Sequence, residues 1–166
     1  MNLFTCCIGA LSLYGVQLNL NPVSLPYGWS QCYNGTYDVF LNTTTLTSVL
    51  NTCNKAKLLL GCRPKGNTNL TVAAMGLRAD VLYNCSTYSS CTNVANGVGW
   101  YYSDNYSWGF ANDNDTVARG SCDTGSTNAA YRLCWHTDQW SGGWRCGATT
   151  GLNFDNTMER VIYHAT

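Results

Sequence analysis

The sequence predicts a mainly antiparallel β domain, a sandwich or barrel stabilised by disulfides and carrying one short helix. Three observations favour this fold class. Short runs of β-branched, aromatic and aliphatic residues alternate with clusters of Gly, Pro, Asn and Asp that are typical of turns. Ten cysteines occur in 166 residues, without the C-x-x-C spacing of zinc sites. Only one segment has helical spacing, whereas a parallel sheet needs a crossover helix between successive strands.

The first segment, residues 1–17, is expected to lie outside a single domain that spans residues 18–166. Leu3 to Val16 is a mostly apolar run of signal-peptide length, too short to cross a bilayer as a helix. No Lys or Arg stands at its start, unlike an ordinary leader. We expect a cleaved leader, and the alternative is a retained hydrophobic strand or helix.

One helix is expected over residues 44–54, where apolar positions 46, 49, 50 and 53 follow the spacing of an amphipathic helix. Thr44 or Thr45 can cap its start. Elsewhere the residue pattern predicts strands separated by turns, which is typical of sandwiches and barrels. The expected strands are Tyr37–Leu41, Lys57–Arg63, Leu70–Met75, Asp80–Tyr83, Val98–Tyr102, Tyr106–Phe110, Tyr131–His136, Trp144–Gly147 and Glu159–Tyr163.

Eight cysteines follow the expected leader, and we predict that they form disulfides. Disulfides persist in oxidising compartments, so the protein is expected to be secreted and extracellular. The possible pairings are too many for the sequence to choose among them. Local geometry favours Cys85–Cys91 across a short loop and Cys134–Cys146 across a hairpin. The eight are Cys32, Cys53, Cys62, Cys85, Cys91, Cys122, Cys134 and Cys146.

Six Asn-x-Ser/Thr triplets mark candidate N-glycosylation sites. Asparagine is common throughout the chain, so the number of triplets is weak evidence, and their position matters more. Asn34, Asn105 and Asn114 fall in predicted turns, where a glycan does not disturb a core. The six asparagines are Asn34, Asn42, Asn69, Asn84, Asn105 and Asn114.

Composition excludes several classes of function. Lys+Arg and Asp+Glu each number 9, so the formal net charge is zero and no basic surface for nucleic acid is expected. Aromatic residues make up 13% of the chain, which is enough apolar surface to exclude disorder. No membrane span and no nucleic-acid partner are therefore expected.

No motif predicts catalysis or a cofactor. The chain has neither a G-x-S-x-G elbow nor an H-E-x-x-H helix, and its only glutamate is Glu159. An extracellular hydrolase that uses two aspartates is therefore a less favoured hypothesis. Asp113 and Asp115 place oxygen donors at alternate positions and are weak calcium candidates. They lack the Gly and distal Glu of an EF-hand, and an Asx-rich turn explains them more simply.

Residues 98–110 are the densest aromatic segment. Folded about Asp104 with a three-residue loop, they place six side chains on one face, which we expect to be the hydrophobic core. The alternative is an open platform on which sugar rings stack. The expected cross-strand pairs are Tyr102–Tyr106, Trp100–Trp108 and Val98–Phe110. On the other face, Tyr101 between two glycines is expected to form a shallow outer surface.

Trp140 lies near the tip of a predicted polar loop, residues 137–143. A Trp in that position is difficult to explain by core packing, although the loop can fold back over the sandwich end. Exposed aromatics mark recognition sites, and neighbouring polar groups set orientation. We expect ring stacking by Trp140, Trp144 and Tyr101. Hydrogen bonding is expected from Asp138, Gln139, Asp104 and Arg145.

Together these features favour a secreted, glycosylated module that binds carbohydrate or another extracellular surface. In length and composition the chain resembles small extracellular lectin-like and adhesion modules. The alternative is a structural subunit of an extracellular filament or coat, because zero net charge removes the repulsion that opposes self-association. In that case residues 1–17 can be donated as a strand to the next subunit.

Overall fold

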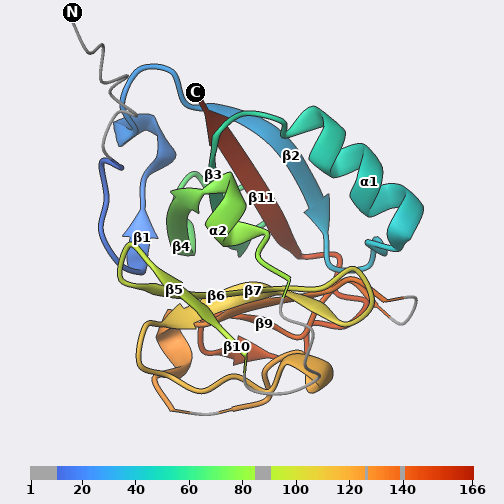
Figure 1. Ribbon diagram of the computed structural model, residues 1–166. Helices are drawn as coiled ribbons and strands as arrows, with labels where there is room; N and C mark the ends of the chain where they lie inside the picture. The colour runs from blue at the N-terminus through green and yellow to red at the C-terminus, as the bar shows by residue number, and fades with distance from the viewer. Residues whose placement is uncertain (1–10, 85–90, 126, 139–140) are drawn as a thin grey trace, which may run out of the picture.

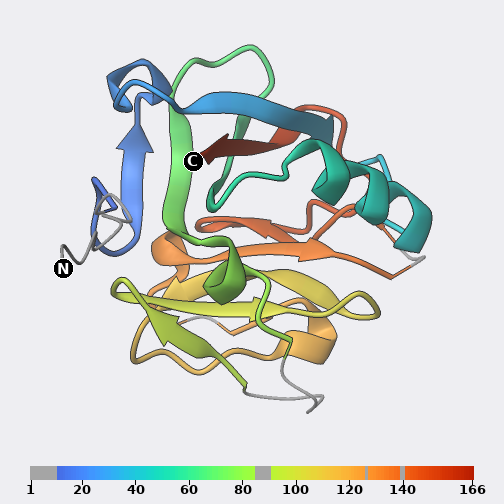
Figure 2. The same cartoon turned by 45° about the horizontal axis from the view of Figure 1, so that its top comes forward.

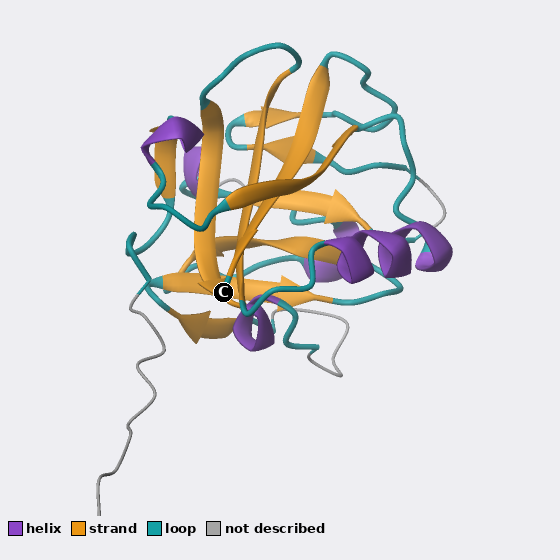
Figure 3. Ribbon diagram, turned by 90° about the horizontal axis from the view of Figure 1, so that it is seen from above, coloured by secondary structure: helices purple, strands orange, loops and turns teal. Residues whose placement is uncertain are grey.

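The fold is an open sandwich of two antiparallel sheets. The computed structural model describes residues 11–84, 91–125, 127–138 and 141–166. A five-stranded sheet, ordered β1-β4-β3-β11-β2, packs on a six-stranded sheet, ordered β10-β9-β8-β7-β6-β5 (Figure 1). Figure 3 shows the strands of one layer crossing those of the other. The predicted mainly antiparallel, disulfide-stabilised fold is confirmed, and in the described part of the chain neither sheet closes into a barrel.

The five-stranded sheet is built around the last strand of the chain. Its strands are β1 (Gln17–Leu20), β2 (Ser30–Thr36), β3 (Lys57–Pro64), β4 (Leu70–Leu77) and β11 (Met158–Ala165). β11 pairs with β3 from Met158 opposite Pro64 to Ala165 opposite Lys57. Its two ends, called here the Met158 end and the Ala165 end, are about 24 Å apart at the usual rise per strand residue. They carry different loops and different surface groups.

The six-stranded sheet is a meander. It comprises β5 (Asn93–Ala95), β6 (Val98–Tyr102), β7 (Ser107–Asn112), β8 (Leu133–His136), β9 (Arg145–Cys146) and β10 (Thr149–Thr150). The predicted pairing of Trp100 with Trp108 is wrong, because Trp100 lies opposite Phe110 and Trp108 lies opposite Tyr102. The Ser103 amide donates to the Ser107 carbonyl (3.0 Å), so the loop is centred one residue later than expected and each opposite residue is shifted by two. A shift of two keeps the side chains of the two strands on their predicted face, whereas Tyr106 lies in the turn before β7 and outside this core cluster.

That face forms the core between the sheets, as predicted. Trp100, Trp108 and Trp135 are fully buried there. The rings of Trp108 and Trp135 meet edge to face, with their centroids 5.4 Å apart. This geometry is favourable for aromatic pairs. The aromatic ladder is therefore the hydrophobic centre of the protein.

Short helices connect the strands. The predicted helix is confirmed as α1 (Thr43–Thr52), and its cap is Asn42, whose side chain accepts from the Thr45 amide. The other helical segments are α2 (Arg78–Val81), η1 (Pro22–Ser24), η2 (Arg119–Ser121) and η3 (Ala129–Tyr131). Strands predicted over Tyr37–Leu41 and Asp80–Tyr83 are wrong. Both segments are connections in which internal hydrogen bonds replace a ladder, such as the Leu82 amide to the Arg78 carbonyl.

Three disulfides connect the described parts of the chain, which indicates an oxidising, extracellular environment. They are Cys32–Cys53, Cys62–Cys146 and Cys122–Cys134. The predicted Cys134–Cys146 bond is wrong. Cys134 lies opposite Arg145 and Leu133 lies opposite Cys146, so the two sulfurs face opposite sides of the sheet. Cys91 is also disulfide-bonded, and Cys85 lies outside the described residues.

The N-terminal segment lies at the β1 edge of the five-stranded sheet (Figure 2) and packs on an apolar cluster of its outer face. Leu11 and Leu13 pack on a second apolar cluster. The Gly15 amide donates to the Asn96 carbonyl (2.8 Å), and the Asn96 side chain donates to the Leu13 carbonyl (2.7 Å). The described residues from Leu11 onward therefore pack against the sheets, and the division at residue 17 stays a prediction. Among the described helices, none has the length and hydropathy to cross a membrane.

Candidate functional site

Tyr101 does not lie on an open surface. Its ring is fully buried and its hydroxyl donates to the Leu133 carbonyl (2.6 Å). Burial also raises the pKa of this hydroxyl well above its usual value. The expected shallow face is covered instead by a cluster that includes Val117 and the Cys122–Cys134 disulfide. Tyr101 is thus a structural residue without a ring face for a ligand.

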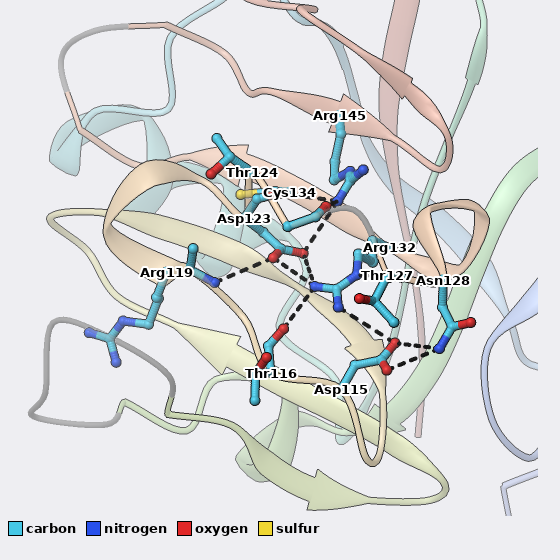
Figure 4. Close-up of polar contacts among 12 residues, drawn as sticks. Asp115, Thr116, Arg119, Asp123, Thr124, Thr127, Asn128, Arg132, Cys134 and Arg145 are labelled. Carbon is cyan, nitrogen blue, oxygen red and sulfur yellow. Dashed lines mark hydrogen bonds and ion pairs between the residues drawn. The ribbon is translucent and has the colours of Figure 1, made fainter.

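Arg145 is also structural rather than exposed. It is buried with Arg132 and Asp123 in a polar cluster beneath the segment that follows β7 (Figure 4). Arg132 binds both carboxylate oxygens of Asp123, at 2.7 and 2.9 Å. Arg145 donates to the Gly125 carbonyl at 2.7 Å. Paired and hydrogen-bonded in this way, the charges hold the covering segment on the sheet.

The Asp123→Asn variant should expose the role of this cluster. Removing the carboxylate charge leaves two buried guanidinium groups without their shared counter-ion. We expect a loss of about 3 kcal/mol in the free energy of unfolding. Urea denaturation measures it, with the exposed Asp104→Asn as the control. Equal stability of the two variants would contradict the assignment.

One of the two calcium candidates, Asp115, belongs to the same polar cluster. The Asp115 carboxylate lies 3.6 Å from Arg132 and accepts from the Asn128 amide at 3.0 Å. A guanidinium at this position opposes a cation. Across the described residues, no group of three or more His, Cys, Asp or Glu side chains is arranged to hold a metal ion.

The structure places two predicted site residues, Asp104 and Asp138, in neighbouring loops. Thr137 hydrogen-bonds the β6–β7 turn through the Tyr106 carbonyl (3.2 Å), which places the Asp138 segment beside the turn that carries Asp104. Asp138 lies 3.5 Å from the Nδ1 atom of His136. Trp144 is half-buried against the cluster around Tyr101. Gln139 and Trp140 lie outside the described residues.

Two histidines are expected to make stability depend on pH. Burial lowers the pKa of His136, and burial together with Lys55 and Arg78 lowers the pKa of His164. The unfolded chain, with ordinary values near 6.5, therefore binds more protons. Stability should fall as pH drops below about 6.5 and level off below the folded-state values. Melting temperatures between about pH 7 and pH 5 test this, and the slope should flatten in the His136→Gln/His164→Gln double variant.

Exposed aromatic rings gather at the Met158 end of the sandwich. Phe40 precedes α1 and is 37% exposed, while Phe154 precedes β11 and is 63% exposed. Their ring centroids are 6.0 Å apart with an interplanar angle of 65°. Val39, which precedes Phe40 in the sequence, is also exposed. We call Val39, Phe40 and Phe154 the aromatic patch.

The first loop of the patch rests on a buried arginine. Arg160 on β11 is fully buried, and its guanidinium donates to the Thr36 carbonyl (2.9 Å) and the Val39 carbonyl. It also lies over the Tyr37 ring, 5.7 Å from the centroid. The neutral Tyr37 hydroxyl, whose pKa is raised by burial, donates to the Arg145 carbonyl (3.0 Å). The loop is therefore held in one position.

The second loop holds Phe154 in an unfavourable backbone conformation. Its φ of +68° lies in the left-handed region, which costs a bulky residue about 1–3 kcal/mol. Asp155 next to it accepts from the amides of Thr157 (2.6 Å) and Met158 (3.0 Å). Such strain at an exposed ring motivates a functional hypothesis, because it contributes nothing to the core.

Polar acceptors flank the patch. Asp38 is exposed, and the hydrogen bond from the Thr157 side chain lowers the pKa of Asp155, so this carboxylate is charged at neutral pH. Within the described ranges, neither carboxylate has a cationic side chain within 4.0 Å. The Asn153 side chain accepts from Ser141 at 2.8 Å. The site offers apolar ring surface beside hydrogen-bond acceptors.

Sequence reasoning missed this patch. Val39 and Phe40 fell in a predicted strand, and Phe154 lay outside every predicted element. The available signal was Phe154 itself, a large apolar residue between Asn153 and Asp155, in a turn-forming segment. The partner ring, 114 positions away in the sequence, could be placed beside it only by the pairing of β2 with β11.

The candidate glycosylation sites differ in exposure. Asn34, Asn84, Asn105 and Asn114 are exposed. Asn42 is half-buried as the cap of α1, and the Asn69 amide donates to the Asn19 side chain (3.0 Å). Glycosylation of these residues stays a prediction.

Comparisons with protein-family models, with curated proteins and with solved structures find no match to the chain.

Proposed function

We propose that this protein is an extracellular glycan-binding module whose platform is the aromatic patch. The observation that carries the proposal is the pair of exposed rings, Phe40 and Phe154, presented together by loops distant in the sequence. Disulfides and the exposed sequons agree with an extracellular setting.

The chemistry of the patch suits a sugar. Aromatic rings offer an apolar face to the C–H groups of a pyranose, and carboxylates accept hydrogen bonds from its hydroxyls. Asp38 and Asp155 stand beside the rings without a cationic partner in the described part of the chain. In this proposal Phe40 and Phe154 stack on the sugar ring, the role that the sequence analysis expected of Trp140 and Tyr101.

The loops are organised before any ligand arrives. Arg160 holds the Val39 carbonyl from below, and the Asp155 hydrogen bonds hold the loop of Phe154. A ligand therefore does not have to order these loops when it binds, and this lowers the entropic cost of association. An exposed platform of this kind is suited to a polysaccharide surface rather than to an enclosed small molecule.

Glycan arrays and polysaccharide pull-down assays with two variants test the proposal. Phe154→Gly removes the ring and the backbone strain together, so we expect binding to be lost while stability rises by about 1 kcal/mol. Phe40→Ala should also abolish binding. Tyr131→Ala is the matched control, because Tyr131 is as exposed as Phe40 at 37%, and it should bind like the unmodified protein.

Two outcomes would contradict the proposal. Retained binding in both phenylalanine variants would move the site elsewhere. A concentration-dependent assembly in light scattering that Phe154→Gly dissolves, with no glycan bound by either form, would favour a filament or coat subunit. In that case the patch would be buried between copies of the chain.

A further inference from the structure

A pocket lies at the Ala165 end, opposite the aromatic patch. It has a volume of about 120 Å³ and is lined by residues of the N-terminal segment, the start of β3 and the end of β11. Tyr27 and Trp29 supply its aromatic rings, and Lys57 is the only charged side chain among the described residues that line it. Pockets for larger ligands usually measure about 300–1,000 Å³, so this one matches a single ring or a group of similar size.

A turn presents the aromatic residues to the pocket. The Trp29 amide donates to the Pro26 carbonyl (3.4 Å), and Gly28 between them has φ +103°. This arrangement is typical of a type II turn, whose third position favours Gly. Tyr27, at the second position, is fully exposed, whereas Trp29 is half-buried against the outer apolar cluster. The Trp29 ring is thus partly packed on the protein, whereas the Tyr27 ring is fully in solvent.

The ammonium group of Lys57 favours a negatively charged ligand. It begins β3, where its neighbours in the sheet are Leu77 and Ala165. No Asp or Glu in the described residues lies within 4.0 Å of its ammonium group. Lys55 and Arg78 lie near the same end, because the Arg78 amide donates to the Ala56 carbonyl (2.8 Å). Neither residue lines the pocket, and the Arg78 guanidinium donates to the Leu50 carbonyl (3.0 Å), so in the described part of the chain Lys57 alone supplies the cationic group that faces a ligand there.

We propose that this pocket binds an anionic sugar residue, a pyranose that carries a carboxylate. Trp29 and Tyr27 contact the ring, and Lys57 pairs with the carboxylate. Charge-assisted hydrogen bonds of this kind are the stronger ones in recognition. The site is separate from the aromatic patch, and neither proposal depends on the other.

Titration with sodium glucuronate, followed by ¹⁵N–¹H NMR of the Trp29 indole, tests the inference. We expect the indole signal to shift with glucuronate and not with glucose. Lys57→Gln should weaken glucuronate binding at least about tenfold, which corresponds to about 1.4 kcal/mol. Tyr27→Ala should weaken it as well. Lys65→Gln is the matched control, because Lys65 is an exposed lysine at the other end of β3, and it should leave binding unchanged.

The remaining outcomes are informative. Equal shifts with glucose, or an unchanged affinity in Lys57→Gln, would overturn the anionic specificity. A response to sodium acetate equal to that to glucuronate would show that any carboxylate suffices and that the sugar ring is not recognised. No shift at millimolar glucuronate in a folded protein would overturn the site. Phe40→Ala separates the two sites, because it should leave glucuronate binding intact.

Discussion

The Arg160→Met variant is expected to lose about 4 kcal/mol of unfolding free energy. The Arg160 guanidinium donates to four backbone carbonyls, those of Gly35, Thr36, Val39 and Gly142, and to the Tyr33 hydroxyl. Methionine fills much of the volume and donates nothing, so carbonyls buried with Arg160 lose their partner. Leaving a buried acceptor unsatisfied costs about 1–3 kcal/mol.

The opposing effect is the cost of burying a charge. Replacing a buried ion pair by apolar residues is often neutral or stabilising. Here no carboxylate of the described residues lies within 4.0 Å of Arg160, and the acceptors are carbonyls that remain after the substitution. The loss of these hydrogen bonds should therefore exceed the gain from no longer burying a charge. Urea denaturation measures it.

Two control variants sharpen the result. Arg160→Lys keeps the charge but cannot span the same set of carbonyls, so it should fall between the unmodified protein and Arg160→Met. Arg63→Met removes a mostly buried pair with Glu159, in which Nε and Oε1 are 2.6 Å apart. Within the described residues Arg63 makes two hydrogen bonds, to Glu159 and to the Thr68 carbonyl, against the five of Arg160, so its loss should cost less. Because Arg160 supports the Val39 carbonyl, glycan binding should weaken in both Arg160 variants. Stability of Arg160→Met equal to that of Arg63→Met would contradict the argument.

Removal of the Cys62–Cys146 disulfide, by replacing both cysteines with Ala, is expected to cost about 4.5 kcal/mol. The bond joins β3 to β9 and therefore one sheet to the other, across a sequence separation of 84 residues. Cross-linking distant residues removes more entropy from the unfolded chain than cross-linking near ones. Removal of Cys122–Cys134, with a separation of 12, should cost about 3 kcal/mol by the same relation.

The order of these two effects is the test. Chemical unfolding of both double variants, monitored by tryptophan fluorescence, gives the two free energies under the same conditions. Each double variant replaces both cysteines of one disulfide. The other two of these three disulfides stay intact, so no free thiol is created among their six cysteines. A larger loss from Cys122–Cys134 would show that local packing outweighs chain entropy.

Local patterns predicted much of the architecture correctly. The alternation of apolar residues in β6 and β7 predicted which face is buried, and that assignment survived a wrong register because a shift of two preserves the face. The spacing around α1 predicted the helix within one or two residues. Cysteine usage predicted disulfides and an oxidising environment.

The functional residues were predicted less well, for a physical reason. Tyr101 and Arg145 looked available because the segment that covers them lies between them in the sequence and outside the strands that carry them. Phe40 and Phe154 looked unrelated because their contact is long-range. Neither the covering of Tyr101 and Arg145 nor the contact between the two phenylalanines follows a local periodicity, so neither could be inferred from the sequence alone.

Taken alone, the amino-acid sequence determined the chemistry of the protein: a disulfide-bonded β domain with no net charge and an aromatic core. These properties depend on composition and on patterns a few residues long, which act wherever the strands are placed. Only the tertiary structure decided which sulfurs join, which rings stay in solvent and where the two candidate binding surfaces lie. Those choices depend on β11 pairing between β2 and β3, and a pairing between residues far apart in the chain is set by global packing.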